Sequence, residues 1–356
     1  MLSFFIVFTV SVPVFSFLLA GWPLRLGRSA GLDGWDTLLC TLGLAPGLIS
    51  LFLYYLMVCF PGRGESFYLG GVVLLFLILG FLGRQGWRDR LRQWRDSRCA
   101  TIGDRTPGVR RRRWPRILFR LTVLSILAAC LWGIMAHVVR QPIKDHDVVQ
   151  YAVMGRIYAQ DRSIDFSGYR PHRATGFYSQ ILHAPSFSLL HTWESFMNHG
   201  LLGRVGDLFF RSLSFFYAVL ILALMYNLLR KRHVGLALLG ILISLSGVAF
   251  FLALSTYHID SYRMFFAFVS WIMLFRSIEG KHRHAFLLLG IFSGLAAFAH
   301  SIGVIVAGLN CLVVFGLGGK TWGEKMAAGS LVSLTVLLFG GVHYVIDTFF
   351  GQGWIF

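Results

Sequence analysis

The 356-residue chain is rich in apolar residues and poor in charge, with 56% hydrophobic residues and only 14% Asp, Glu, Lys or Arg. A soluble domain carries roughly 25% charged residues, so this composition excludes an ordinary soluble fold. The net charge of +17 does not indicate nucleic-acid binding. Its basic residues gather in short clusters between apolar runs, as they do in the cytoplasmic loops of membrane proteins.

The apolar runs predict an all-α polytopic membrane bundle of about ten transmembrane helices. A helix needs roughly 20 apolar residues to cross a hydrocarbon core of about 30 Å, and a spanning helix satisfies its own backbone in lipid. The first run lacks a basic start and is expected to be a retained helix rather than a cleaved signal. The spans are expected at about 2–20, 38–60, 66–83, 117–138, 208–229, 234–254, 262–277, 285–301, 302–318 and 327–349.

The segment Arg84–Arg116 sets the expected topology. It holds twelve Arg and three Asp, and such a loop stays in the cytoplasm. Counting spans from it places 139–207 on the extracytoplasmic side. The basic clusters at 230–233, 281–284 and 320–325 then all fall on the cytoplasmic side, so one topology accounts for every cluster.

The 139–207 segment is the longest stretch outside the predicted spans, and a long loop with its own structure is usually functional. Its first half is expected to form an amphipathic helix along the membrane surface, with Tyr151 and Ile157 turned toward the bundle. The polar residues expected on its outer face are Gln150, Arg156 and Gln160.

Two carboxylates, Asp145 and Asp147, flank His146 just beyond the fourth predicted span. Such a pair can serve an acid/base reaction or hold a divalent cation such as Mg²⁺ or Mn²⁺. The structural alternative is that Asp147 caps a helix beginning at Val148. Both roles can coexist.

The run Asp147–Ala152 resembles the first extracytoplasmic loop of the GT-C glycosyltransferases, with an Asp at a membrane exit, an aromatic residue and a small-residue helix. The similarity is closest to the family 39-like branch of protein O-mannosyltransferases and aminoarabinose transferases. The stretch His183–Leu190 resembles that family's His/Pro-Pro-Leu stretch, and Arg211 matches an Arg at the start of the next span.

Two later segments extend the resemblance. Ser255–Phe265, with Asp260, resembles the family's later outer loop, and Leu289–Ala296 followed by His300 resembles its Gly-x-x-x-Gly helix. The chain departs from the family in three ways. The usual Asp-Glu pair is Asp145-His146-Asp147, a family Lys is His300, and three additional spans precede the similar region while little follows it.

The resemblance implies three parts: three additional helices over 1–83, the Arg-rich loop over 84–116, and a seven-helix GT-C-like module over 117–350. It implies an inverting enzyme that moves a sugar from a polyprenyl-phosphate donor to an extracytoplasmic lipid, glycan or protein. No cofactor is required in this branch, although Asp145 and Asp147 leave a metal possible.

By the same resemblance, Asp147 is the expected general base, with Asp145 as the second carboxylate. The cations expected to bind the donor phosphate are Arg170, Arg173, Arg211, Arg263 and His300. The other expected site residues are His146, Tyr151, His183 and Asp260. The structural alternatives are solvated loop charges, snorkelling anchors at span ends and a hydrogen-bonded bundle histidine.

Two other classes of function stay open: a polytopic transporter or flippase, and a non-catalytic GT-C-like membrane subunit. The expected location is the bacterial inner membrane, with the active site extracytoplasmic. The expected partners are the lipid-linked donor, membrane lipids and the acceptor, without nucleic acid.

Overall fold

The computed structural model describes residues 2–22, 26, 30–100, 114–140, 146–164, 184–203, 206–247, 259–280 and 283–350, and every regular element in these ranges is helical. The prediction of an all-α fold is therefore confirmed for this part of the chain. Five helical segments are long and apolar enough to cross a membrane, as a helical membrane protein requires. They are Leu2–Leu19, Gly34–Cys59, Glu65–Gly86, Leu208–Arg230 and Trp322–Ile346.

The N-terminal part contains three long helical segments. The first is α1 (Leu2–Thr9), which continues through the π-helical turn η1 (Val10–Val14) into α2 (Phe15–Leu19). Pro13 lies inside η1, where the missing N–H of proline interrupts regular helical bonding. The other two segments are α4 (Gly34–Cys59) and α5 (Glu65–Ala100).

The Arg-rich segment is partly helical rather than a loop from its first residue. Helix α5 runs through Arg84 and ends only at Ala100. The stretch from 84 to 100 contains no proline and a single glycine, and its Arg, Gln and Leu residues are good helix formers. Its cytoplasmic location stays a prediction.

The middle of the chain contains α6 (Trp114–Arg140), α7 (His146–Asp161), α8 (Ser186–Leu202) and α9 (Leu208–Arg230). Helix α7 confirms the expected helix in the first half of 139–207. Helix α8 was not predicted. It begins after Pro185, ends at Gly203 in the left-handed conformation (φ 58°), and packs against α4, α5, α7 and α9. The second half of this segment therefore enters the bundle.

The C-terminal part contains α10, which packs against α9, three consecutive helices and a kinked last segment. Its helices are α10 (Val234–Ser246), α12 (Asp260–Gly280), α13 (Arg283–Ala299), α14 (Ser301–Leu317), α15 (Trp322–Val336), the π-turn η4 (Leu337–Gly341) and α16 (Val342–Phe350). All ten predicted spans coincide with helices, although the span expected at 234–254 is described only to 247. The number that cross the membrane stays a prediction.

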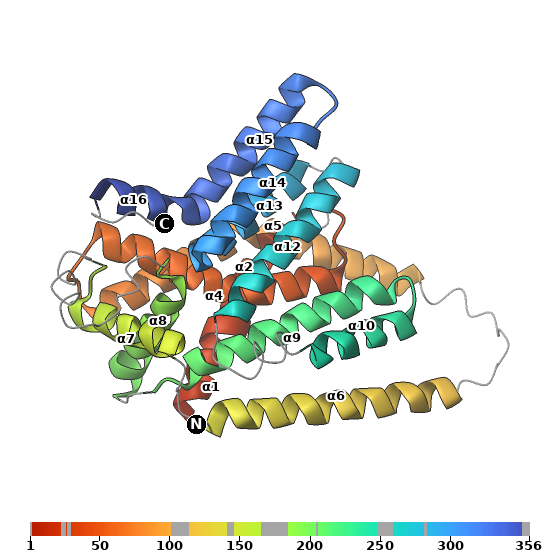
Figure 1. Cartoon of the computed structure of the whole chain (residues 1–356), viewed down its shortest axis with the longest axis horizontal. Helices are drawn as coiled ribbons and strands as arrows, with labels where there is room; N and C mark the ends of the chain where they lie inside the picture. Colours follow the sequence, from red (N-terminus) through yellow and green to blue (C-terminus); the bar gives the residue numbers. More distant parts are fainter. Residues whose placement is uncertain are drawn as a thin grey trace.

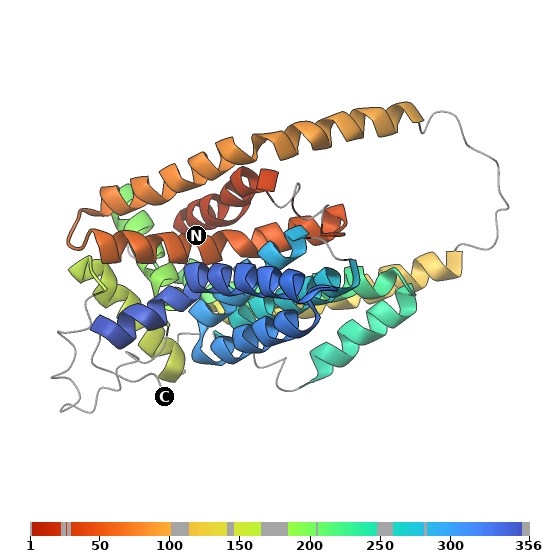
Figure 2. The ribbon, with the colours of Figure 1, turned by 90° about the horizontal axis from the view of Figure 1, so that it is seen from above.

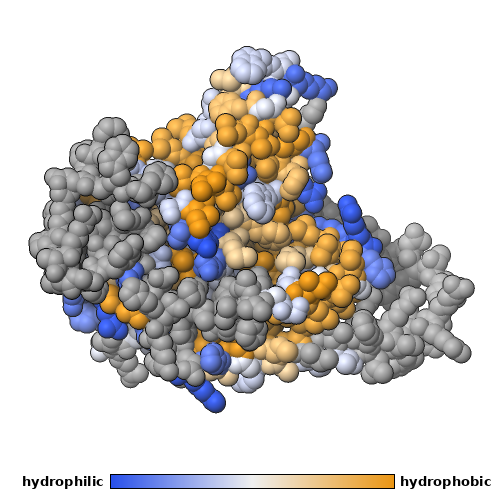
Figure 3. Space-filling view, viewed as in Figure 1, coloured by the Kyte–Doolittle hydropathy of each residue, from blue (hydrophilic) through white to orange (hydrophobic). Residues whose placement is uncertain are grey.

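Figures 1 and 2 show the arrangement of the helices from two sides: α6 and α9 follow the long axis, and α12 to α15 cross it at an angle in Figure 1. Helices α7, α8 and α16 lie toward one end, whereas the end of α5 and the start of α6 lie toward the other. Many large apolar side chains on the spans are exposed, including Leu74, Phe81 and Leu312. Figure 3 shows hydrophobic residues across the middle of one face, as expected for a surface in contact with lipid.

Glycines let α13 approach the last helical segment closely. A Cβ on Gly294 would lie 2.8 Å from the Cβ of Phe339 and 3.0 Å from the carbonyl oxygen of Val336. Nearby, the amide of Asn310 on α14 donates to Ser270 on α12 (3.0 Å) and Ser293 on α13 (2.9 Å). Close backbone approach and interhelical polar bonds are the main contacts that join helices in membranes.

Replacing Gly294 with Ala is expected to destabilise the protein by about 1–3 kcal/mol, because the added methyl group overlaps atoms that cannot move independently. Gly308→Ala is the matched control, since a Cβ there meets nothing within 4 Å. Its better helix propensity should leave stability unchanged or slightly higher. Thermal unfolding in detergent measures both variants, and equal unfolding temperatures would contradict the packing of α13.

Candidate functional site

An aromatic cluster centred on Phe187 joins the helices that carry the predicted site residues. The ring of Phe187, at the start of α8, lies 5.7 Å from Tyr151 on α7, 4.5 Å from Phe210 on α9 and 5.7 Å from Tyr262 on α12. All four rings are buried. Four helices therefore meet at one place in the bundle.

Arg211, next to Phe210, lies where α9 begins and α6 ends. Its guanidinium donates to the carbonyl of Val138 near the end of α6 (3.0 Å) and lies 3.6 Å from the carboxylate of Asp207. The Arg211 side chain is only 12% exposed. It is thus held inside the protein at the expected membrane exit, rather than extending to the surface as a snorkelling anchor would.

Asp260 and Arg263 form an ion pair in the first turn of α12, with 2.7 Å between Arg263 Nη2 and Asp260 Oδ1. Both side chains are partly exposed. The carboxylate also lies at the positive end of the α12 dipole. The two residues therefore act as one unit in this structure, with the acidic partner reducing the charge that Arg263 presents to a phosphate.

His300 connects α13 to α14 as a helix cap. Its Nδ1 accepts the backbone N–H of Ile302 at 3.1 Å. A nitrogen that accepts a hydrogen bond carries no proton, so this geometry requires a neutral imidazole. His300 thus has a structural role here, and a phosphate ligand would meet at most an N–H donor rather than a full cation.

The carboxylate segment is described only in part. Helix α7 begins at His146, so Asp147 lies inside its first turn, and the prediction that Asp147 caps a helix starting at Val148 is wrong. A carboxylate in a first turn still interacts favourably with the helix dipole. The side chains of His146 and Asp147 are not described. The predicted site residues Asp145, Arg170, Arg173 and His183 lie outside the described residues.

Helix α7 confirms most of its predicted orientation. Tyr151 is 3% exposed and Ile157 packs against the core, whereas Arg156 and Gln160 are exposed. Gln150 is 6% exposed, so its expected place on the outer face is wrong. The buried helix α8, which was not foreseen, packs along α7 and leaves less of it open to solvent.

Within the described ranges, the structure contains no group of three or more His, Cys, Asp or Glu side chains arranged to hold a metal ion. Asp145 lies outside these ranges, and the Asp147 side chain is not described. The suggestion that Asp145 and Asp147 hold Mg²⁺ or Mn²⁺ therefore stays a prediction.

The sequence analysis missed Glu194, a carboxylate buried in the middle of α8. The residue is 1% exposed, and its two oxygens accept the backbone N–H groups of Phe209 and Phe210, each at 2.9 Å. Burial raises the pKa of Glu194 to about 8, and the nearby charge of Asp207 adds to this effect, whereas the two N–H groups oppose it. The sequence feature that could have identified Glu194 is the position of a carboxylate inside an apolar stretch.

His191, one turn before Glu194 on α8, was missed for the same reason. It is 1% exposed, and its ring lies edge-on to Phe210 with 5.1 Å between ring centres. Burial lowers the pKa of His191 to about 4, with the positive charge of Arg156 adding to the effect. The imidazole is therefore neutral at physiological pH.

Three hydroxyl groups, including that of Tyr262 in the aromatic cluster, connect α8 to its neighbours. Ser186 on α8 bonds to Tyr262 on α12 at 2.5 Å and to Ser50 on α4 at 2.9 Å. All three residues are buried. Hydrogen bonds of this kind fix the start of α8 in a place where water and lipid cannot reach it.

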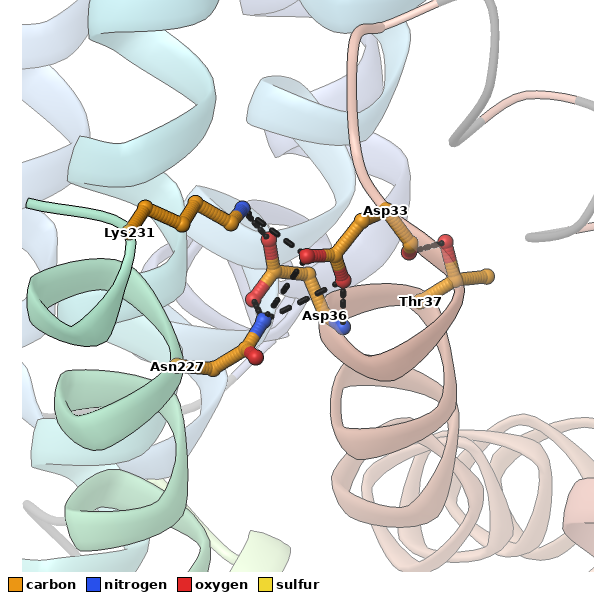
Figure 4. A network of polar contacts seen from close by, with 5 residues as sticks. All are labelled: Asp33, Asp36, Thr37, Asn227 and Lys231. Atoms are coloured by element: carbon orange, nitrogen blue, oxygen red, sulfur yellow. Dashed lines mark hydrogen bonds and ion pairs between the residues drawn. The ribbon is translucent and has the colours of Figure 1, made fainter. Parts of the chain in front are cut away.

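A second polar network, also missed, joins α4 to α9 at the opposite end (Figure 4). Lys231 Nζ lies 2.9 Å from Asp33 Oδ2 and 3.0 Å from Asp36 Oδ2. The side-chain amide of Asn227 donates to both carboxylates, at 3.1 Å to Asp33 and 2.5 Å to Asp36. Asp36 is buried, and Asp33 also caps α4 by accepting the Asp36 N–H at 2.7 Å.

Asp33 and Lys231 both stay charged in this network. Burial alone would raise the pKa of Asp33, but the bonds from the Asp36 N–H, Lys231 and Asn227 outweigh it and hold the value at about 2. Burial would lower the pKa of Lys231, and its bonds to the two carboxylates raise it instead. The network lies beside a predicted cytoplasmic cluster, where it locks two helix ends together.

Comparison with protein-family models, curated proteins and solved structures finds no match to this chain. The geometry of this chain, together with the resemblance in its sequence, therefore carries the functional argument.

Replacing His191 with Gln is expected to remove part of the acid sensitivity of the fold. In the unfolded protein His191 has a pKa near 6.5 and is protonated below that pH, whereas in the folded protein its pKa is about 4 and it stays neutral. The free energy of unfolding of the wild-type protein therefore falls as the pH drops from 6.5 toward 4. At pH 5 the loss is roughly 2 kcal/mol, at about 1.4 kcal/mol per pKa unit. Apparent unfolding temperatures of the wild-type protein and of His191→Gln at pH 7 and pH 5 test this. An equal decrease in both proteins between the two pH values would contradict it.

Lys231→Met should destabilise the protein by about 1–3 kcal/mol, because Asp33 and the buried Asp36 would lose the ammonium group that binds both of them. The partial exposure of Lys231 places the effect below that of a fully buried pair. Lys320→Met is the control, since Lys320 lies exposed in the turn before α15. Equal unfolding temperatures for both variants would show that the network contributes nothing.

Proposed function

We propose that this protein is a membrane glycosyltransferase that moves a sugar from a polyprenyl-phosphate donor to an extracytoplasmic lipid, glycan or protein. The observation that carries the proposal is the Phe187 cluster, which joins the helices bearing Asp147, Arg211 and Asp260. The order and spacing of these residues resemble those of GT-C enzymes. A donor with its phosphate at the membrane surface would meet all three helices at once.

In the proposed reaction, Asp147 takes the proton from the acceptor hydroxyl while the oxygen attacks the anomeric carbon. The bond between this carbon and the donor phosphate breaks on the opposite face, so the sugar configuration inverts. Polyprenyl phosphate departs with the electron pair. In the proposal Arg211, held between α6 and α9, stabilises that charge through charge-assisted hydrogen bonds.

The proposal places the active site on the extracytoplasmic side of a bacterial inner membrane. This side is supported by the Arg content of the end of α5 and the start of α6, which lie at the opposite end of the bundle from α7 and α8. Membrane lipids surround the bundle and carry the donor. A transporter or flippase and a non-catalytic GT-C-like subunit are the competing classes, and the transfer assay separates them from an enzyme.

We expect Asp147→Asn to lower sugar transfer by about 10²–10⁴-fold, because an amide cannot accept the proton of the acceptor hydroxyl. Insertion and donor binding should persist, since the amide has the size of the carboxylate. The assay uses purified protein in lipid nanodiscs, a polyprenyl-phosphate sugar and a lipid or peptide acceptor. Asp161→Asn is the control, because Asp161 lies at the far end of the same helix.

Wild-type transfer rates in Asp147→Asn would contradict the assignment of Asp147 as the base. Asp145→Asn adds a second comparison, because its effect should be mild in a metal-free site and nearly as severe if the two carboxylates share a cation. A protein that binds the donor but transfers nothing to any acceptor would favour the transporter or subunit class.

A further inference from the structure

Glu194 connects the buried helix α8 to the first turn of α9, which carries Arg211. We propose that Glu194 is a positioning residue that fixes Arg211 for the donor phosphate by anchoring the start of α9. This inference rests on the proposed function, because it takes Arg211 as a phosphate ligand. It adds a residue on α8 that contributes through α9 rather than by touching the donor.

The bond pattern at the start of α9 is unusual. The first N–H groups of a helix lack partners within the helix and are commonly bonded by the side chain at the N-cap. Among the described residues, Asp207 at this N-cap makes no such bond and instead lies beside Arg211. Glu194 supplies the missing acceptors, one oxygen each for Phe209 and Phe210.

The anchor itself is held firmly. Trp193, next to Glu194, donates its indole N–H to Ser11 at 2.8 Å, and Thr192 donates to the carbonyl of Gly155 at 2.9 Å. Trp193 and Thr192 are fully buried. Because these bonds reach the N-terminal segment and α7, the position of the Glu194 carboxylate follows that of the whole bundle.

Two hydrogen bonds of Arg211, beside its ion pair with Asp207, help to fix where it lies. Its backbone N–H bonds to the carbonyl of Asp207 at 3.0 Å, which places it in the turn that Glu194 holds. Its guanidinium reaches the carbonyl of Val138 on α6 at 3.0 Å. If the first turn frayed, the guanidinium would lose this fixed place beside the end of α6, and a phosphate would bind a disordered side chain.

The test uses Glu194→Gln in the full-length protein, with Glu65→Gln as the matched control. Glu65 lies in the first turn of α5 and pairs with His199 at 3.0 Å. Binding of a short polyprenyl phosphate to protein in nanodiscs is measured at pH 9, where the Glu194 carboxylate is charged. Hydrogen exchange over residues 206–212 reports on the anchored turn without any ligand.

Glutamine can accept one of the two N–H groups through its oxygen, but its NH₂ group faces the other. Glu194→Gln should therefore weaken polyprenyl phosphate binding by about tenfold and speed exchange at the start of α9. Arg211→Ala should weaken binding by about 10–100-fold. The double variant should bind no more weakly than Arg211→Ala alone, because both substitutions remove the same interaction. Glu65→Gln should change neither measurement.

Two results would overturn the positioning role and leave the proposed function intact. One is a double variant whose loss of polyprenyl phosphate affinity is the sum of the two single losses. The other is unchanged binding by Glu194→Gln while Arg211→Ala binds weakly. Unchanged binding in Arg211→Ala would overturn both, since Arg211 would not bind phosphate. Rapid exchange of the Phe209 and Phe210 amides in the wild-type protein would also refute the anchor, whether or not any variant folds.

Discussion

The partners of a polar group inside a helix bundle must come from the protein, because lipid offers no hydrogen bonds. Three partnerships of this kind join helices in the described part of the chain. Asp36 is paired with Lys231 and Asn227 at one end, Asn310 bonds to two serines in the middle, and Glu194 holds the start of α9 near the other end. Each partnership joins different helices.

These partnerships make α4 and α9 a common framework. Lys231 and Asn227 join the two helices at one end, and the Tyr217 hydroxyl donates to the Gly43 carbonyl at 2.8 Å farther along. Helix α8 is then tied to α4 through Ser50 and to α9 through Glu194. The proposed site is therefore assembled on a fixed framework rather than on a surface loop, which suits a reaction that needs aligned groups.

The apolar runs made the helices predictable, because a run of spanning length has few alternatives to a helix in lipid. Helix α8 was not predictable in the same way. Its buried face mixes Trp193 and Phe196 with His191 and Glu194, so it lacks the uninterrupted apolar run that identifies the spans. The burial of such a helix depends on partners supplied by distant segments, and those contacts leave no trace in local sequence.

Parts of the proposed site could be inferred from sequence and parts could not. The order of Asp147, Arg211 and Asp260 along the chain was visible, but the cluster around Phe187 that brings their helices together was not. The pairing of Arg263 with Asp260 and the capping role of His300 are local contacts, three and two residues apart, that depend on where α12 and α14 begin. A sequence pattern identifies charged residues near span ends, whereas geometry determines the charge each one presents.

The most direct measurement is an experimental structure of the protein in lipid with a bound polyprenyl-phosphate sugar. The proposed function predicts the phosphate within hydrogen-bonding distance of Arg211 and the anomeric carbon facing Asp147, in a cavity beside the ends of α6, α9 and α12. A phosphate bound elsewhere, or Asp147 and Arg211 opening into separate regions, would contradict the proposed function.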